Sequence, residues 1–189
     1  MSGGSARQAN FGLSDTPRQG VAQIRGNLLA DAYVLYTKTR NYHWNVVGPQ
    51  FNDRHTFFEA QDNELNDIVD DVAERTRALG ELTLGTLAAF VQHSRLKEHP
   101  GFYPEAHDTL ANLLADHEAL LRFLPVDLET CADAYHDIGT NDFLTGLTER
   151  HEQMAWMLRA FLEGTSVSSM TVGGAPPVVI KTLVMTGLV

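Results

Sequence analysis

Several features are scarce or missing in this sequence, and each absence narrows the classes of protein to which it can belong. The chain has one cysteine, Cys131, so it cannot form an intrachain disulfide. It does not open with a positively charged segment followed by an apolar run, as a secretory signal would. The apolar stretch of residues 178–189 is interrupted by Lys181 and is shorter than the ~20 residues of a membrane-spanning helix. We therefore expect a cytoplasmic protein without a membrane segment.

Positive charge is also in short supply. Lys and Arg number 14 against 24 Asp and Glu, which gives a formal net charge of −10 at pH 7. Affinity for nucleic-acid phosphates depends mainly on Lys and Arg, so this balance argues against a free-standing nucleic-acid binder. It suits a protein that gathers cations.

The rest of the composition, with 43% hydrophobic residues in 189, is typical of one globular domain. Residues 1–15 are polar and indicate a flexible N-terminal arm. We expect the domain over residues 16–164. We expect an apolar C-terminal tail over residues 165–189, and its composition favours docking on this subunit or a neighbouring one over a disordered or membrane-touching role.

Apolar residues recur at helical spacing in four long segments and one short one, and no strand-like alternation competes before the tail. The first long helix is expected from Thr16 to the Gly48-Pro49 break, and the second from Asn52 or Asp53 to Leu79. A short helix is expected from Thr86 to His93, and the third long helix starts at Pro104 and is kinked or divided between Pro125 and Ala132. The last helix is expected from its cap, Thr140, to Gly164. This order predicts an all-α protein, an antiparallel four-helix bundle with a short extra helix between the second and third long helices.

A stripe of polar side chains follows the second long helix. At about 100° per residue, Glu59, Asp70 and Glu74 lie roughly 40°, 60° and 100° from His55. The same sector contains Asp62, Asn63 and Asn66. The opposite face is apolar and would contact the bundle core, so the four ligand-type residues would point away from their own core.

The axial spacing divides this stripe into two pairs. Glu59 and Asp70 are about 16 Å apart along the helix, too far for one metal ion. His55 with Glu59, and Asp70 with Glu74, are i, i+4 pairs that can each converge. Two copies of the helix, antiparallel across a twofold axis near Leu65, would bring opposite pairs together and form two shared sites per dimer.

His43 lies across the Gly48-Pro49 break and can approach the His55 end from the first helix. Two imidazoles with three carboxylates suit Fe(II), Zn(II), Co(II) or Mn(II) better than Cu(I) or a thiolate site. Iron is favoured, because an exposed site with few ligands leaves coordination positions open for peroxide or dioxygen.

Residues 42–51, YHWNVVGPQF, followed by His55, Phe58, Glu59 and the run DDVAER at 70–75, resemble the signature of the Dps family, the twelve-subunit mini-ferritins. The resemblance covers residues 20–163 and implies a ferritin-like fold. It also implies a ferroxidase centre at the twofold interface, with His43, His55, Asp70 and Glu74 as metal ligands. Glu59 stands where the family usually has Asp.

The resemblance further implies oxidation of Fe(II) by hydrogen peroxide, or more slowly by dioxygen, and storage of Fe(III) in a hollow dodecamer that protects against oxidative damage. Zinc could substitute for iron at the same site. Asp137 and Asp142 resemble the acidic positions that line iron-uptake pores at the threefold axis, although a carboxylate early in a helix is also a common dipole partner. Trp44 resembles a tryptophan near the iron site, with ordinary packing as the alternative.

Two rival functions keep the same fold. The first is a DNA-compacting shell, but residues 1–26 contain no lysine and only three arginines, so we expect DNA binding to be weak or absent. The second is a redox-inert buffer that holds zinc. His117 and His151, each followed by Glu, are expected to be solvated or packing residues, and Met154, Trp156 and Met157 are expected in the core.

Overall fold

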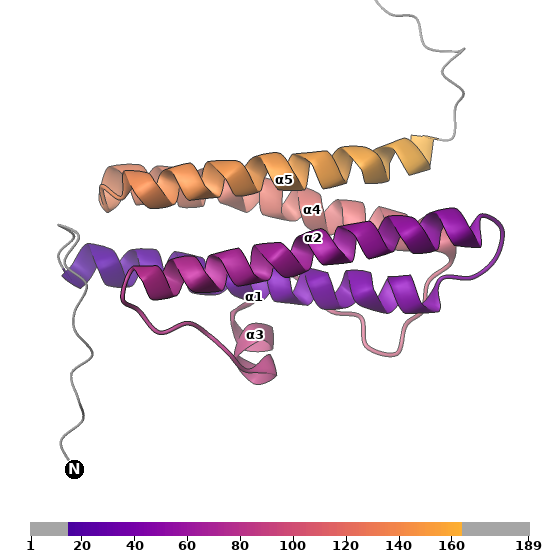
Figure 1. The fold of residues 1–189 in the computed structure, drawn as a ribbon, viewed down its shortest axis with the longest axis horizontal. Coiled ribbons are helices and arrows are strands. Elements are labelled where there is room, and N and C mark those ends of the chain that lie inside the picture. The colour runs from indigo at the N-terminus through magenta and orange to yellow at the C-terminus, as the bar shows by residue number, and fades with distance from the viewer. Residues whose placement is uncertain (1–14, 164–189) are drawn as a thin grey trace, which may run out of the picture.

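The computed structural model describes residues 15–163, and within this range it contains helices but no strand. The four long helices are α1 (Asp15–Asn45), α2 (Phe51–Ala78), α4 (Ala106–Glu129) and α5 (Ile138–Glu163). The short helix α3 (Leu87–His93) lies outside the bundle, beside α1 (Figure 1). The predicted all-α bundle with its extra short helix is confirmed.

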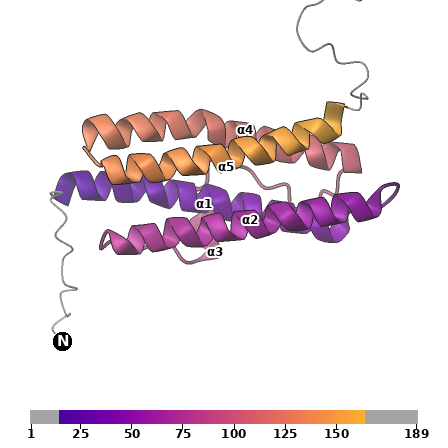
Figure 2. The same cartoon turned by 45° about the horizontal axis from the view of Figure 1, so that its top comes forward.

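The helices form two layers, α1 with α2 and α4 with α5 (Figure 2). Lys38 of α1 pairs with Asp116 of α4, and Gln61 of α2 donates to the Met154 carbonyl of α5. Further contacts join Tyr42 of α1 to Asn112 of α4 and Glu64 of α2 to Arg150 of α5. As the residue number rises along one helix of each pair it falls along the other, so α1 is antiparallel to α4, and α2 is antiparallel to α5. Consequently α2 and α4 point the same way, and the connection over residues 79–105 must cross the length of the bundle. One long crossover is the ferritin-like topology.

Turn residues set the boundaries of α2. Gly48 has a φ of 92° and Gln50 a φ of 62°, so the chain reverses through left-handed backbone immediately before Phe51. The helix thus begins one or two residues earlier than predicted. It ends at Ala78, and Gly80 follows with a φ of 84°, the conformation that glycine adopts without a Cβ clash.

Leucines dominate the core between the layers, and the predicted apolar face of α2 is confirmed. Phe58, Leu65, Ile68 and Val72 are fully buried. Trp156 does not share this environment. It is 62% exposed, although Met154, two positions earlier, is buried. The prediction of a core position for Trp156 was wrong, because it lies on the opposite side of α5 from Met154.

The junction between α4 and α5 differs from the prediction at two points. Helix α4 continues through Pro125 to Glu129 and is followed by a π-helical turn, Thr130–Ala134, so the chain does not divide at the proline. Helix α5 begins at Ile138, ahead of the predicted cap. The Thr140 N–H donates to Asp137 Oδ1 at 2.9 Å, so Asp137 caps the helix and Thr140 lies in its first turn.

None of the helices in the described part of the chain is both long and apolar enough to cross a membrane. The predicted N-terminal arm and C-terminal tail fall almost entirely outside the described residues.

Candidate metal centre

His43 and His55 meet where α1 ends and α2 begins. Their Nε2 atoms are 3.2 Å apart. Metal–nitrogen distances to imidazole are about 2.0–2.1 Å, so two nitrogens at this separation can bind one ion with an N–metal–N angle of about 100°. The prediction that His43 approaches the His55 end of α2 therefore agrees with the geometry.

The other ring nitrogen of each histidine faces a hydrogen-bond acceptor. His43 Nδ1 lies 2.7 Å from Asp62 Oδ2, and His55 Nδ1 lies 3.1 Å from the His43 carbonyl oxygen. A carboxylate and a carbonyl only accept, so in the neutral form of each ring Nδ1 carries the proton and Nε2 presents a lone pair. Two opposed lone pairs repel unless a cation lies between them. The donor set thus fits a bound metal ion.

Asp62 has a different environment from the one the sequence suggested. The angular arrangement placed it in the solvent-facing stripe, whereas its side chain is fully buried. It also forms an ion pair with Arg40 Nη2 at 3.0 Å. Asp62 follows His55 by seven residues, two helical turns, and this spacing was the available signal that both side chains lie near the first helix.

The three predicted carboxylates do not join the histidines within the chain. Glu59, Asp70 and Glu74 are all exposed on α2. In the described residues no group of three or more ligand-type side chains converges. One chain therefore presents a histidine pair at one end of α2 and the exposed Asp70–Glu74 pair toward the other end.

Apolar side chains surround the histidine pair on the surface. Trp44, Val47 and Phe51 are exposed, and the Phe51 ring stacks on His55 with centroids 5.1 Å apart. Trp44 is 69% exposed, so its side chain is not packed inside its own chain. Exposed apolar groups gathered around an incomplete site are typical of a surface that another molecule covers.

Asp137 and Asp142, the predicted pore residues, have unlike surroundings. Asp137 is buried, and its two oxygens accept from the Thr140 N–H and hydroxyl at 2.9 and 2.6 Å. It also lies close enough to Arg25 to favour the charged guanidinium, although burial lowers the pKa of Arg25 overall. Asp142 is exposed on the first turns of α5. Only Asp142 presents its carboxylate to solvent.

His117 and His151 form a second histidine pair, inside the bundle between α4 and α5. Both are fully buried, and their Nδ1 atoms are 3.0 Å apart. Burial lowers the pKa of His117 well below its usual value and that of His151 to about 4. These residues pack in the core as neutral imidazoles, so the solvated alternative is excluded.

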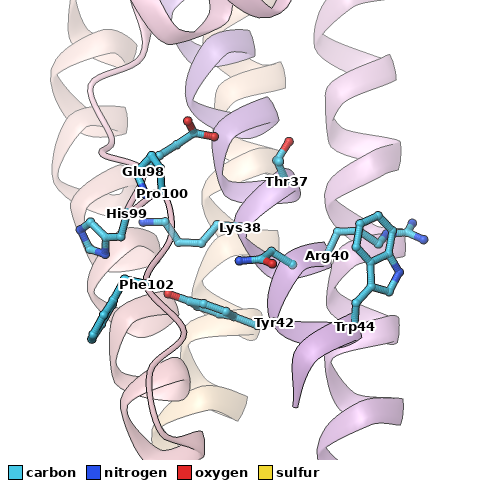
Figure 3. A pocket seen from close by; sticks show the side chains of 10 residues that line it. Thr37, Lys38, Arg40, Tyr42, Trp44, Glu98, His99, Pro100 and Phe102 are labelled. Atoms are coloured by element: carbon cyan, nitrogen blue, oxygen red, sulfur yellow. The ribbon is translucent and has the colours of Figure 1, made fainter.

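A cavity of about 320 Å³ lies beside α1, separate from the histidine pair. Figure 3 shows Lys38 and Tyr42 reaching toward the loop that carries His99 and Phe102. Arg40 and Trp44 also line the cavity, and they project from α1 on the opposite side to Lys38 and Tyr42 (Figure 3). None of the five predicted metal ligands lines this cavity.

Comparison with known proteins places the chain in a family. The family model of the ferritin-like domain matches residues 26–166. A low temperature-induced protein of Nostoc sp. is 47% identical over 84% of this chain and 88% of its own length. The DNA protection during starvation protein of Brevibacillus brevis is 35% identical over 77% of this chain and 97% of its own length. The chain belongs to the Dps family of ferritin-like proteins.

The fold of this Dps protein is close to those of solved relatives. The Dps protein of Vibrio cholerae O1 superposes with a TM-score of 0.76 at 30% identity, covering 84% of this chain and 99% of that one. That protein is described as a member of a broad superfamily of ferritin-like diiron-carboxylate proteins. The exposed carboxylates of Glu59, Asp70 and Glu74 are of the ligand type that such a description names.

Proposed function

We propose that this Dps protein binds Fe(II) at sites shared between two subunits, oxidises it with hydrogen peroxide or more slowly with dioxygen, and stores Fe(III) inside a hollow dodecamer. Membership of the Dps family supports the general role in iron storage and stress protection. The observation that carries the specific proposal is the opposed Nε2 pair of His43 and His55, 3.2 Å apart and joined by no third ligand among residues 15–163.

The missing ligands are available on the same helix of a second subunit. Asp70 and Glu74 are exposed about 16 Å and about 22 Å along α2 from Glu59. In an antiparallel pair of α2 helices, Asp70 and Glu74 of the partner reach the His43, His55 and Glu59 of the first chain. The arrangement repeats at the other end, so each dimer contains two sites.

The imidazole and carboxylate ligands have different roles at such a site. The two neutral imidazoles anchor the first Fe(II), and the carboxylates of Glu59, Asp70 and Glu74 compensate the charge that accumulates as iron is oxidised. Two Fe(II) ions each give one electron to one hydrogen peroxide molecule, which takes up two protons and leaves as two water molecules. Zinc fits the same ligands but has no redox chemistry.

Iron would reach the hollow interior of the proposed dodecamer through a pore beside the start of α5. Asp142 is exposed there, whereas both oxygens of Asp137 are engaged by Thr140. Asp142 is therefore the carboxylate free to pass ions along the proposed pore, and Asp137 holds the helix start beside it.

The test is anaerobic loading of the apo-protein with Fe(II), followed by hydrogen peroxide and optical detection of Fe(III). We expect the His43→Ala, His55→Ala variant to react more than about tenfold slower, because even groups outside the ligand set typically change metal affinity or activity 10–100-fold. A His93→Ala, His107→Ala variant, which removes two exposed histidines away from the site, is the matched control and should react normally.

If the His43→Ala, His55→Ala variant forms Fe(III) as fast as the control variant, the site assignment is refuted. Tight zinc binding without consumption of peroxide would instead favour the redox-inert buffer. A gel shift at physiological salt that persists in the His43→Ala, His55→Ala variant would favour the DNA-compacting shell, which the net charge of −10 disfavours.

A further inference from the structure

We propose that Asp62 is the positioning residue of the metal centre, a buried carboxylate that fixes the ring of His43 so that its Nε2 faces the metal. This inference rests on the proposed function. Asp62 has no exposed surface, and its Oδ2 lies 2.7 Å from His43 Nδ1. Carboxylates that hold the second nitrogen of a metal-binding histidine fix both its tautomer and its orientation.

Arg40 keeps Asp62 in this positioning role. Its Nη2 lies 3.0 Å from Asp62 Oδ1, on the side away from His43, and donates to the Tyr36 hydroxyl at 3.3 Å. The guanidinium also lies over the Tyr36 ring, 5.4 Å from its centroid. The two carboxylate oxygens are thus divided between a permanent cation and an imidazole N–H. Because Arg40 already compensates the negative charge of Asp62, this carboxylate orients His43 and does not bind the metal.

The two histidines are held by opposite helices. His43 belongs to α1 and is held by a side chain of α2, whereas His55 belongs to α2 and donates to the His43 carbonyl of α1. That carbonyl lies in the last turn of α1, where main-chain oxygens lack intrahelical donors. The histidine half of the site is therefore assembled within each chain, before a partner supplies its carboxylates.

The informative substitution is Asp62→Asn, which preserves shape but not hydrogen-bonding capacity. Both neighbours of Asp62 are donors, whereas an asparagine amide offers one acceptor oxygen and an NH2 group. Arg40 is permanently charged and would take the oxygen, so the NH2 would face His43 Nδ1. His43 would then carry its proton on Nε2, where it blocks the metal.

The test is Co(II) binding by the apo-oligomer, followed by calorimetry and by the visible spectrum of the bound ion. We expect Asp62→Asn to weaken binding 10–100-fold, with a changed spectrum. Asp31→Asn is the matched control, because Asp31 is an equally buried aspartate paired with an arginine, Arg95, away from the site. It should bind Co(II) as the unaltered protein does.

Thermal unfolding of the apo-proteins separates a loss of fold from a loss of positioning. If Asp62→Asn does not assemble, the Arg40→Leu, Asp62→Leu variant removes both charges together and leaves no unpaired ion in the interior. The same 10–100-fold loss is expected for it.

Wild-type affinity in the assembled Asp62 variants, with binding lost in His43→Ala, would overturn the positioning role and leave the proposed function standing. Unchanged binding in His43→Ala would overturn both. Weakened binding in the Asp62 variants at normal apo-protein stability would support the proposal.

Discussion

At the scale of single residues, the buried pair of His117 and His151 makes the stability of this protein depend on pH. Both imidazoles lie in the core, where burial disfavours their charged forms, and Arg150 lowers the pKa of His151 further. Their Nε2 atoms have no hydrogen-bond partner. The folded protein therefore resists protonation at a place where the unfolded chain accepts protons readily.

The histidine pKa values in the unfolded and the folded protein decide whether stability rises or falls with pH. The unfolded chain binds protons at its histidines as the pH falls below about 6.5, whereas His151 in the folded protein does so only near 4. Stability is therefore lost as the pH falls from about 6.5 toward 4. The shift at His151 corresponds to roughly 3 kcal/mol.

We expect thermal unfolding at fixed protein concentration to show a clear drop in midpoint between pH 7.5 and pH 5. The His117→Leu, His151→Leu variant should lose much of this drop, because no imidazole remains to protonate. An equal drop in the variant would assign the acid sensitivity to other groups.

At the scale of helices, the start of α5 depends on Asp137. Asp137 is predicted from the family resemblance as a pore carboxylate, yet it is buried and caps α5 through both oxygens. It also lies near the buried guanidinium of Arg25, which contacts the hydroxyl of Thr140 at 3.4 Å. Within the chain, its carboxylate is engaged by the first turn of α5.

Substitution of Asp137 should accordingly affect the fold. Asp137→Ala removes the cap and the compensating charge for Arg25, so we expect it to lower the free energy of unfolding by at least about 1 kcal/mol. Asp142→Ala, at an exposed position on the same helix, should change it by less than about 0.5 kcal/mol. Denaturant titration of both variants makes the comparison, and equal stability would show that the cap is dispensable.

At the scale of the whole molecule, the metal centre is proposed to belong to a pair of subunits. This arrangement predicts complementation between two inactive variants. In a mixed dimer of His43→Ala, His55→Ala with Asp70→Ala, Glu74→Ala, one site receives both altered halves and the other receives both unaltered halves. One complete site is restored in each mixed dimer.

With equal amounts of the two variants and random pairing, half of the dimers are mixed, so about a quarter of the normal number of sites should be active. The measurement is peroxide-driven Fe(III) formation after co-expression, compared with each variant alone. Activity no higher than in either variant alone would rule out a shared site of this geometry.

The sequence by itself determined the helical architecture and the histidine pair of the candidate metal centre. Apolar spacing, with breaks at Gly48-Pro49 and Gly80, was sufficient for the bundle, because helix periodicity and breakers are local properties. The approach of His43 to His55 followed from a short connection between two helices. The separation of Glu59 from Asp70 along one rigid helix likewise followed from its rise per residue.

Tertiary structure alone decided the environments of Asp62, Asp137, His117 and His151. An angular position on a helix gives a direction but not what lies there, so Asp62 was placed in solvent although Arg40 and His43 of α1 cover it. Likewise the His117 and His151 pair depends on two helices meeting in space. Burial and partners are properties of packing between distant segments, and packing between α1 and α2 is what places the buried carboxylate of Asp62 against the ring of His43.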